Sequence, residues 1–92
     1  MITLDQVVVK TPDTVSRIIE KEAVIILPAH GQVKVVNEVG ARLWELADGT
    51  RTVADMVDIL CEEYAVMREQ AEEDALEFIQ RMIEKKMFVV MG

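Results

Sequence analysis

The sequence has little of what metal sites and disulfide-stabilised folds need. It holds one cysteine, Cys61, and one histidine, His30. A lone cysteine cannot form an internal disulfide, which favours a reducing compartment, so we expect a cytoplasmic protein. With no second histidine and no cysteine pair at ligand spacing, we expect no metal site. His30 is interpreted as a solvated turn residue and Cys61 as a packing thiol.

Long apolar runs and an excess of basic residues are missing as well. No apolar segment approaches the roughly 18 residues that a membrane span needs, and no signal-peptide pattern opens the chain. Ten basic residues are outnumbered by 17 acidic ones, which gives a net charge of −7. This balance disfavours nucleic acid and anionic membranes as partners, because binding phosphates needs clustered Lys and Arg.

Glycine is also scarce, at four residues, and no glycine-rich phosphate-binding loop occurs. Gly40 stands isolated inside a predicted helix. We therefore expect no catalytic residue, no cofactor and no enzymatic activity from this chain alone.

What remains is enough apolar sequence for one small core. Hydrophobic residues make up 51% of the 92 residues and recur with clear periodicity, which predicts a single folded domain over residues 1–92. Within it, residues 1–14 are expected to be either flexible or an edge strand at Val7–Val9. The short break at Pro12 follows that segment.

The middle of the chain predicts a sheet that leads directly into a helix. Residues 15–21, 23–27 and 32–36 are rich in β-branched residues and predict a three-stranded antiparallel sheet. The apolar run 23–27 predicts a strand that is buried on both faces or lies at the sheet centre. Asn37 is a good N-cap for a helix that carries Trp44 and stops at Asp48-Gly49.

Two further helices follow. Thr52 and Asp55 predict a capping box, and an amphipathic stripe continues from Val53 to Tyr64. A longer helix is predicted from about Arg68 to Lys86, with a terminal strand at 88–90. The fold class is therefore α+β, a winged-helix-like domain with an N-terminal three-stranded antiparallel sheet followed by three helices.

The third helix separates two kinds of binding protein. A winged-helix transcription regulator would place basic or amide side chains on this helix. Residues 69–77 instead hold five acidic residues and no basic one, so DNA binding is disfavoured. The apolar arc of this helix is wide and extends to Leu76 and Ile83. If that edge lies beside the free strand 32–36, the two form a peptide groove. A homodimer interface, as in a structural dimerisation module, explains the same arc equally well.

The run from Gln32 to Met87 resembles the PqqD family of small peptide chaperones, also known as RiPP precursor recognition elements. The matching stretches are VVNEVGARLWELADGTRTVADMVDILCEEYAV and AEEDALEFIQRMIEKKM. Most of the signal comes from the Asn37 cap, residues 43–46 and residues 48–53. The resemblance implies a non-catalytic domain that binds the leader of a ribosomally made precursor peptide. It would present that leader to a modifying enzyme, often a radical SAM protein, as in PQQ or related biosynthesis.

In that family the leader pairs with the third strand and packs against the third helix. Carried over to this chain, the implied strand residues are Gln32, Val33, Lys34, Val35 and Val36. The helix residues inferred to face them are Glu73, Leu76, Gln80 and Ile83. Since Glu69, Glu73 and Glu77 would border the groove, we expect a leader with at least one Lys or Arg near its apolar anchors.

Overall fold

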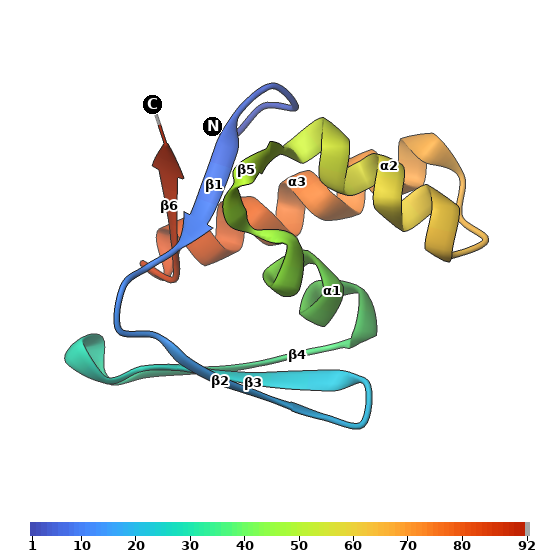
Figure 1. The fold of residues 1–92 in the computed structure, drawn as a ribbon. Helices are drawn as coiled ribbons and strands as arrows, with labels where there is room; N and C mark the ends of the chain where they lie inside the picture. The colour runs from blue at the N-terminus through green and yellow to red at the C-terminus, as the bar shows by residue number, and fades with distance from the viewer. Residues whose placement is uncertain (92) are drawn as a thin grey trace.

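In the computed structural model of the chain, which describes residues 1–91, the predicted sheet forms from three consecutive strands (Figure 1). These are β2 (Val15–Ile19), β3 (Glu22–Leu27) and β4 (Gln32–Val36), which pair antiparallel in that order. A short 3₁₀ turn, η1 (Pro28–His30), joins β3 to β4. It ends at Gly31, whose φ of 61° lies in the left-handed region that glycine adopts without a steric penalty.

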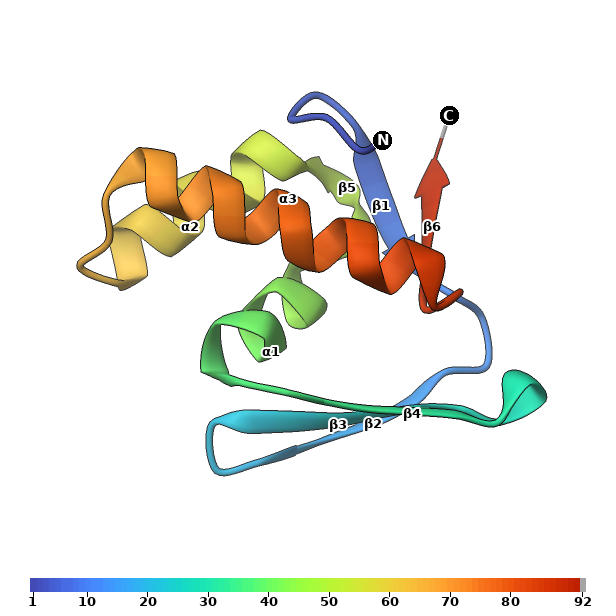
Figure 2. The same ribbon diagram turned by 180° about the vertical axis from the view of Figure 1, so that it is seen from behind.

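The central strand β3 buries only one of its faces. Its side chains alternate along the pleat, so Ala23, Ile25 and Leu27 are buried while Ile26 on the opposite face is 37% exposed. Of the two predicted alternatives, the position at the sheet centre is therefore confirmed and burial on both faces is wrong. Figures 1 and 2 show the helices on one side of this sheet and none on the other.

A second sheet joins three segments that are far apart in the sequence. Its middle strand is β1 (Val7–Lys10), which pairs antiparallel with β5 (Asp48–Thr52) and with β6 (Phe88–Met91). The terminal strand is confirmed, but the prediction of an edge strand at Val7–Val9 is wrong, because β1 is paired on both sides and Val8 is fully buried. β5 was not predicted from the sequence.

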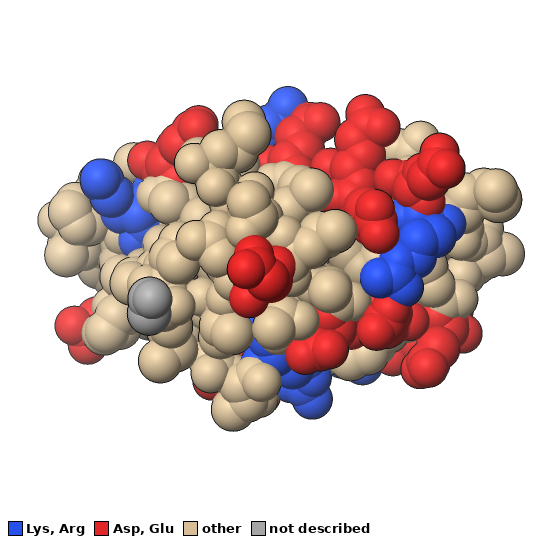
Figure 3. All heavy atoms as spheres, turned by 90° about the horizontal axis from the view of Figure 1, so that it is seen from above, with Lys and Arg blue, Asp and Glu red and all other residues tan. Residues whose placement is uncertain are grey.

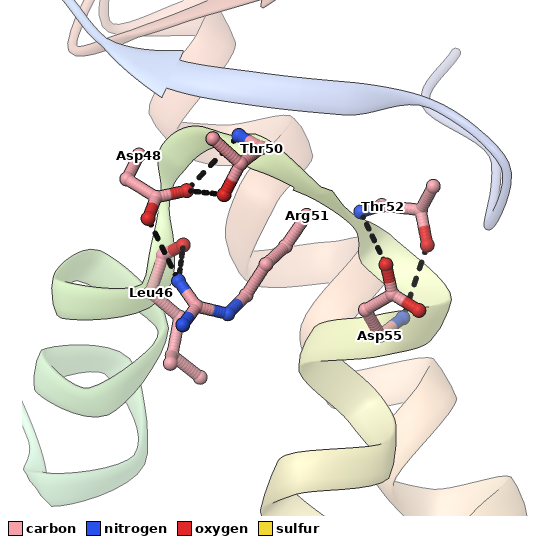
Figure 4. Close-up of polar contacts among 6 residues, drawn as sticks. All are labelled: Leu46, Asp48, Thr50, Arg51, Thr52 and Asp55. Atoms are coloured by element: carbon pink, nitrogen blue, oxygen red, sulfur yellow. Dashed lines mark hydrogen bonds and ion pairs between the residues drawn. The ribbon is translucent and has the colours of Figure 1, made fainter.

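A small polar network shapes β5 and the junction between the first two helices (Figure 4). The Asp48 carboxylate accepts hydrogen bonds from the backbone N–H and the hydroxyl of Thr50, at 3.0 and 2.6 Å, and pairs with Arg51 at 2.8 Å. Hydrogen bonds from Thr50 hold the pKa of Asp48 below its ordinary value. Gly49, with φ of 85°, allows the chain to turn here. These residues, which form one of the three stretches that carry most of the family resemblance, therefore have a structural role.

The three helices begin and end close to the predicted residues. They are α1 (Glu38–Leu46), α2 (Val53–Glu63) and α3 (Arg68–Glu84). The side-chain oxygen of Asn37 accepts from the N–H of Gly40 at 3.0 Å, and Thr52 with Asp55 forms the predicted capping box (Figure 4). The α+β class, a three-stranded antiparallel sheet followed by three helices, is confirmed.

The core lies between the two sheets and the helices. Trp44 of α1 is 2% exposed and stacks on Phe88 of β6, with ring centroids 5.3 Å apart. One face of α3 reaches the same core through its fully or nearly fully buried residues, which are Ala71, Ala75, Ile79 and Met82. This anchoring fixes the rotation of α3 about its axis, and hence which flanks of the helix remain available.

Candidate functional site

β4 is an edge strand of its sheet. Its only strand partner within residues 1–91 is β3, so the opposite side of its backbone pairs with no strand. Such an edge presents free N–H and C=O groups that can pair with an added extended chain. Figure 2 shows β4 passing below α3, with the start of α1 at one end and the η1 turn at the other.

A hollow of about 380 Å³ separates the second half of β4 from α3, and we call it the β4 hollow. Lys34 and Val36 occupy alternate positions on the sheet face that carries the core side chains, so they share the face toward the helices. Phe78, Arg81 and Met82 border the hollow from α3. The complete lining is Glu22, Lys34, Val35, Val36, Asn37, Phe78, Arg81 and Met82.

A second hollow of about 300 Å³, the α1 hollow, lies between α1 and α3. It shares Asn37, Phe78 and Arg81 with the β4 hollow, so the two adjoin. We call them together the β4–α3 groove. Its remaining lining residues are Val39, Gly40, Leu43, Asp74 and Glu77.

Gly40 allows the three walls of this groove to approach each other. A Cβ atom at this position would lie 2.9 Å from Phe78 Cε1 and 3.0 Å from Val36 Cβ, both closer than ordinary contact. The isolated glycine of α1 therefore has a packing role. The Phe78 ring is also held from behind, edge-on to Phe88, with centroids 6.2 Å apart. Phe78 is thus a positioned, half-buried aromatic between the two hollows.

The opposite flank of α3 faces the N-terminal segment. The Ile2 backbone N–H donates to Gln80 Oε1 at 2.9 Å, and the Ile2 side chain is 5% exposed. A third hollow, of about 290 Å³, lies there; Glu77 and Arg81 border it as well as the groove, and its other lining residues are Met1, Ile2, Leu76, Gln80 and Glu84.

The structure thus brings together only part of the site predicted from the sequence. Lys34, Val35 and Val36 line the β4 hollow, whereas Gln32 and Val33 lie nearer the η1 turn. Leu76 and Gln80 belong to the opposite flank. Ile83 is half-buried against the core, and Glu73 is exposed.

The helix residues that face β4 are the ones that sequence reasoning missed. Successive α-helical residues are about 100° apart, so Leu76 and Phe78 point to nearly opposite sides. Phe78 belongs to the apolar arc of α3, and Arg81 lies near the helix C-terminus, where a basic residue complements the helix dipole, so the sequence does not single out either residue as a site candidate. One feature of the sequence could have indicated Phe78. Position 78 holds a bulky aromatic residue and position 40 an isolated glycine, and a large side chain often packs where a glycine leaves room.

Acidic side chains dominate the helical half of the face seen in Figure 3, whereas the half over β1 and β6 is mostly uncharged. Along α3, Glu69, Glu73, Asp74 and Glu77 are exposed. Only Asp74 and Glu77 of these line the β4–α3 groove. The acidity of α3 is therefore mostly a solvated face.

The described part of the chain holds neither a membrane-spanning helix nor a metal-ligand cluster. No helix within residues 1–91 is both long and apolar enough to cross a membrane. Over the same residues, His, Cys, Asp and Glu nowhere gather in the groups of three or more that could hold a metal ion.

Comparison with known proteins places the groove in a family context. The family model described as Coenzyme PQQ synthesis protein D (PqqD) matches residues 22–87, well over half of the chain. That range contains β3, β4 and all three helices, which form every wall of the groove. The solved structure of TbiB1 in complex with the TbiA(beta) leader peptide is similar, with a TM-score of 0.79 and 28% identity over 87% of this chain and 93% of that one. No curated protein matches the chain.

Proposed function

The chain belongs to the PqqD family, and on that premise we propose that it is a non-catalytic peptide chaperone. It binds the leader of a ribosomally synthesised precursor peptide as an added strand on β4. It then presents that leader to a modifying enzyme, a radical SAM protein in our proposal, as in PQQ or related peptide biosynthesis.

One observation carries this proposal: an unpaired strand edge lies beside a preformed groove. Backbone pairing along β4 supplies affinity without regard to sequence, and side chains on one face of the added strand enter the groove. Strand addition needs both features at the same place. The likeness to TbiB1, which was solved with a leader peptide bound, supports the same function.

The proposed contacts combine prediction and structure. We keep the strand residues Gln32 to Val36, since they form the free edge. On α3 we propose Phe78 and Arg81 in place of the four residues predicted from the sequence, because both border the β4 hollow and, unlike the fully buried Met82, both reach its surface. The half-buried Phe78 ring offers an aromatic anchor surface of the kind that dominates binding energy at interfaces.

A second candidate is self-association through the same edge. Val33 and Val35 are 64% and 59% exposed, and an unpaired strand can pair with its own copy. In that case a leader and a second protomer compete for β4. Light scattering with and without leader tests this, because leader binding should then convert dimer to monomer.

The proposal is tested by titrating the purified protein with synthetic leaders of precursor peptides encoded beside its gene, using calorimetry. We expect saturable binding at micromolar Kd or tighter, about −8 kcal/mol or better. N-methylation of alternate leader amides should weaken binding, and N-methylation of the intervening amides should not, because only alternate N–H groups of an edge-paired strand point at β4. Absence of binding to every neighbouring leader would overturn the proposal.

A further inference from the structure

The β4–α3 groove has charges of opposite sign at its two ends. The β4 hollow is lined by two cationic side chains, Lys34 and Arg81, against one carboxylate, Glu22. The α1 hollow is lined by two carboxylates, Asp74 and Glu77, against Arg81. Although the whole chain carries a net charge of −7, the strand end of this groove is therefore cationic.

Both cations of the β4 hollow retain capacity for a ligand. Arg81 pairs with Glu77 through Nη2 at 2.7 Å, one turn away on an exposed helix face. Such an exposed pair is weak, and a guanidinium has five N–H donors, so a carboxylate can join without displacing Glu77. Lys34 is half-buried and has no acidic group within salt-bridge distance in residues 1–91.

The other end of the groove, at the α1 hollow, likewise retains an acidic side chain that can bind a cationic group of a ligand. Asp74 accepts a hydrogen bond from Gln70 at 2.8 Å, and no cation of residues 1–91 pairs with it. Asp74 lies two turns before Arg81 on the same flank of α3. Phe78 stands between them and belongs to both hollows. The order along the groove is therefore cationic, aromatic, anionic.

We propose that this groove selects a peptide segment with an acidic residue over Lys34 and Arg81, an apolar residue over Phe78, and a basic residue near Asp74. The inference rests on the proposed function and deepens it, because it specifies the chemistry of the bound leader. The expectation from the sequence, a basic residue near the apolar anchors, accounts for one end only.

The spacing of these three residues follows from the helix and strand rises. Seven residues separate Asp74 from Arg81, which is about 10 Å along α3. An extended chain advances about 3.3 Å per residue, and only alternate side chains face the same way. The shortest spacing that gives three such side chains spans about 13 Å, close to the separation on α3, so we expect the pattern acidic-x-apolar-x-basic, or the same pattern reversed. Which order occurs reports whether the peptide runs parallel or antiparallel to β4.

The test is an mRNA-display selection of random 12-residue peptides on the full chain. Parallel selections use the charge-reversed pair Lys34→Glu/Arg81→Glu and the control Lys21→Glu, an exposed cation in the β2–β3 turn. We expect wild type and control to enrich the pattern. The reversed pair should enrich a basic residue at the acidic position. Peptides selected on the wild type are then synthesised, and their acidic residue is replaced by its amide. This replacement should raise Kd about three- to tenfold at low salt, and less at high salt.

Three outcomes distinguish failure of the charge pattern from failure of the proposed chaperone function. Enrichment that inverts only in the reversed pair establishes the charge pattern. Selected peptides that shift β4 resonances but show no charge preference overturn the inference and leave the chaperone function standing. No selected binder, together with no binding of any neighbouring leader, overturns both. If circular dichroism shows that the reversed pair is unfolded, Lys34→Gln/Arg81→Gln takes its place. With that pair the acidic preference should disappear, and its persistence would overturn the inference.

Discussion

The flank of α3 that faces β4 and the flank that faces the N-terminal segment differ in what covers them. Ile2 covers part of the N-terminal flank, where its N–H is bound to Gln80 and its side chain is buried. No strand of residues 1–91 pairs along the β4 edge, and the groove beside it is bordered by Phe78 and Arg81. Apolar residues on one helix thus have two roles. Those on the flank that is covered by the protein's own chain stabilise the fold, and those on the open flank can bind a peptide.

The largest effect is expected at the open flank. Phe78→Ala should weaken leader binding at least tenfold, about 1.4 kcal/mol, because it removes the aromatic surface common to both hollows. It should also lower the free energy of unfolding by about 1–3 kcal/mol, through lost packing on Phe88. Calorimetry below the unfolding transition measures the first effect, and chemical denaturation the second. Unchanged affinity would mean that the leader does not contact this flank.

Leu76→Glu tests the covered flank, where we expect a loss of stability and little change in leader affinity. A charge beside Ile2 should destabilise the chain by about 1–2 kcal/mol, because it disrupts the apolar contact with the N-terminal segment. Leader affinity should stay within about twofold of wild type. Since the sequence alone placed Leu76 in the peptide site, a tenfold loss of affinity in a folded variant would favour that assignment over the one drawn from the structure.

Gln80→Ala removes two hydrogen bonds from the covered flank: the one from the Ile2 N–H, and the exposed one that Gln80 donates to Glu84 at 3.2 Å. We expect the free energy of unfolding to fall by about 1 kcal/mol, because the Ile2 N–H loses its acceptor, and we expect leader affinity to be unchanged. Gln70→Ala is the matched control, since it removes the corresponding bond that Gln70 donates to the exposed Asp74 four residues on, and this substitution should cost less stability. Equal destabilisation by both variants would argue against anchoring of the N-terminal segment by Gln80.

The smallest effect is expected at Asp48, which lies away from both flanks of α3. The hydrogen bonds from Thr50 lower the pKa of Asp48 from its ordinary value of 3.8, so their stabilisation is present above that pH and is lost as pH falls through the folded-state pKa. Asp48→Asn should therefore lower Tm slightly at pH 7, and the difference from wild type should shrink toward pH 3. A difference that stayed constant with pH would show that the Asp48 charge plays no part.

Local features of this fold were predictable from the sequence because their causes are local. The Asn37 cap and the Thr52–Asp55 capping box each depend on residues three positions apart, and both formed as predicted. β5 depends instead on pairing with β1, about 40 residues away. Its sequence, Asp-Gly-Thr-Arg-Thr, has the composition of a turn, so no local pattern could identify a strand.

The candidate site divides in the same way. The strand side was predictable, because an edge at residues 32–36 follows from the order of the β-rich segments. The helix side was not, because the apolar arc of α3 is wide enough to serve either flank. Two distant features decide between the flanks: Ile2 occupies the Leu76 side, and Gly40 admits Phe78 on the other. Neither contact can be predicted from the sequence of α3 alone, because Ile2 and Gly40 lie in other parts of the chain.

The central claim, that a leader binds as a strand between β4 and α3, is tested most directly by NMR of the complex with a bound leader. Intermolecular NOEs are measured between the unlabelled peptide and the isotope-labelled protein. We expect cross-strand NOEs from the leader Hα and amide protons to Lys34, Val35 and Val36, together with NOEs from leader side chains to the Phe78 ring. NOEs confined to Ile2 and Leu76, with none to β4, would contradict it.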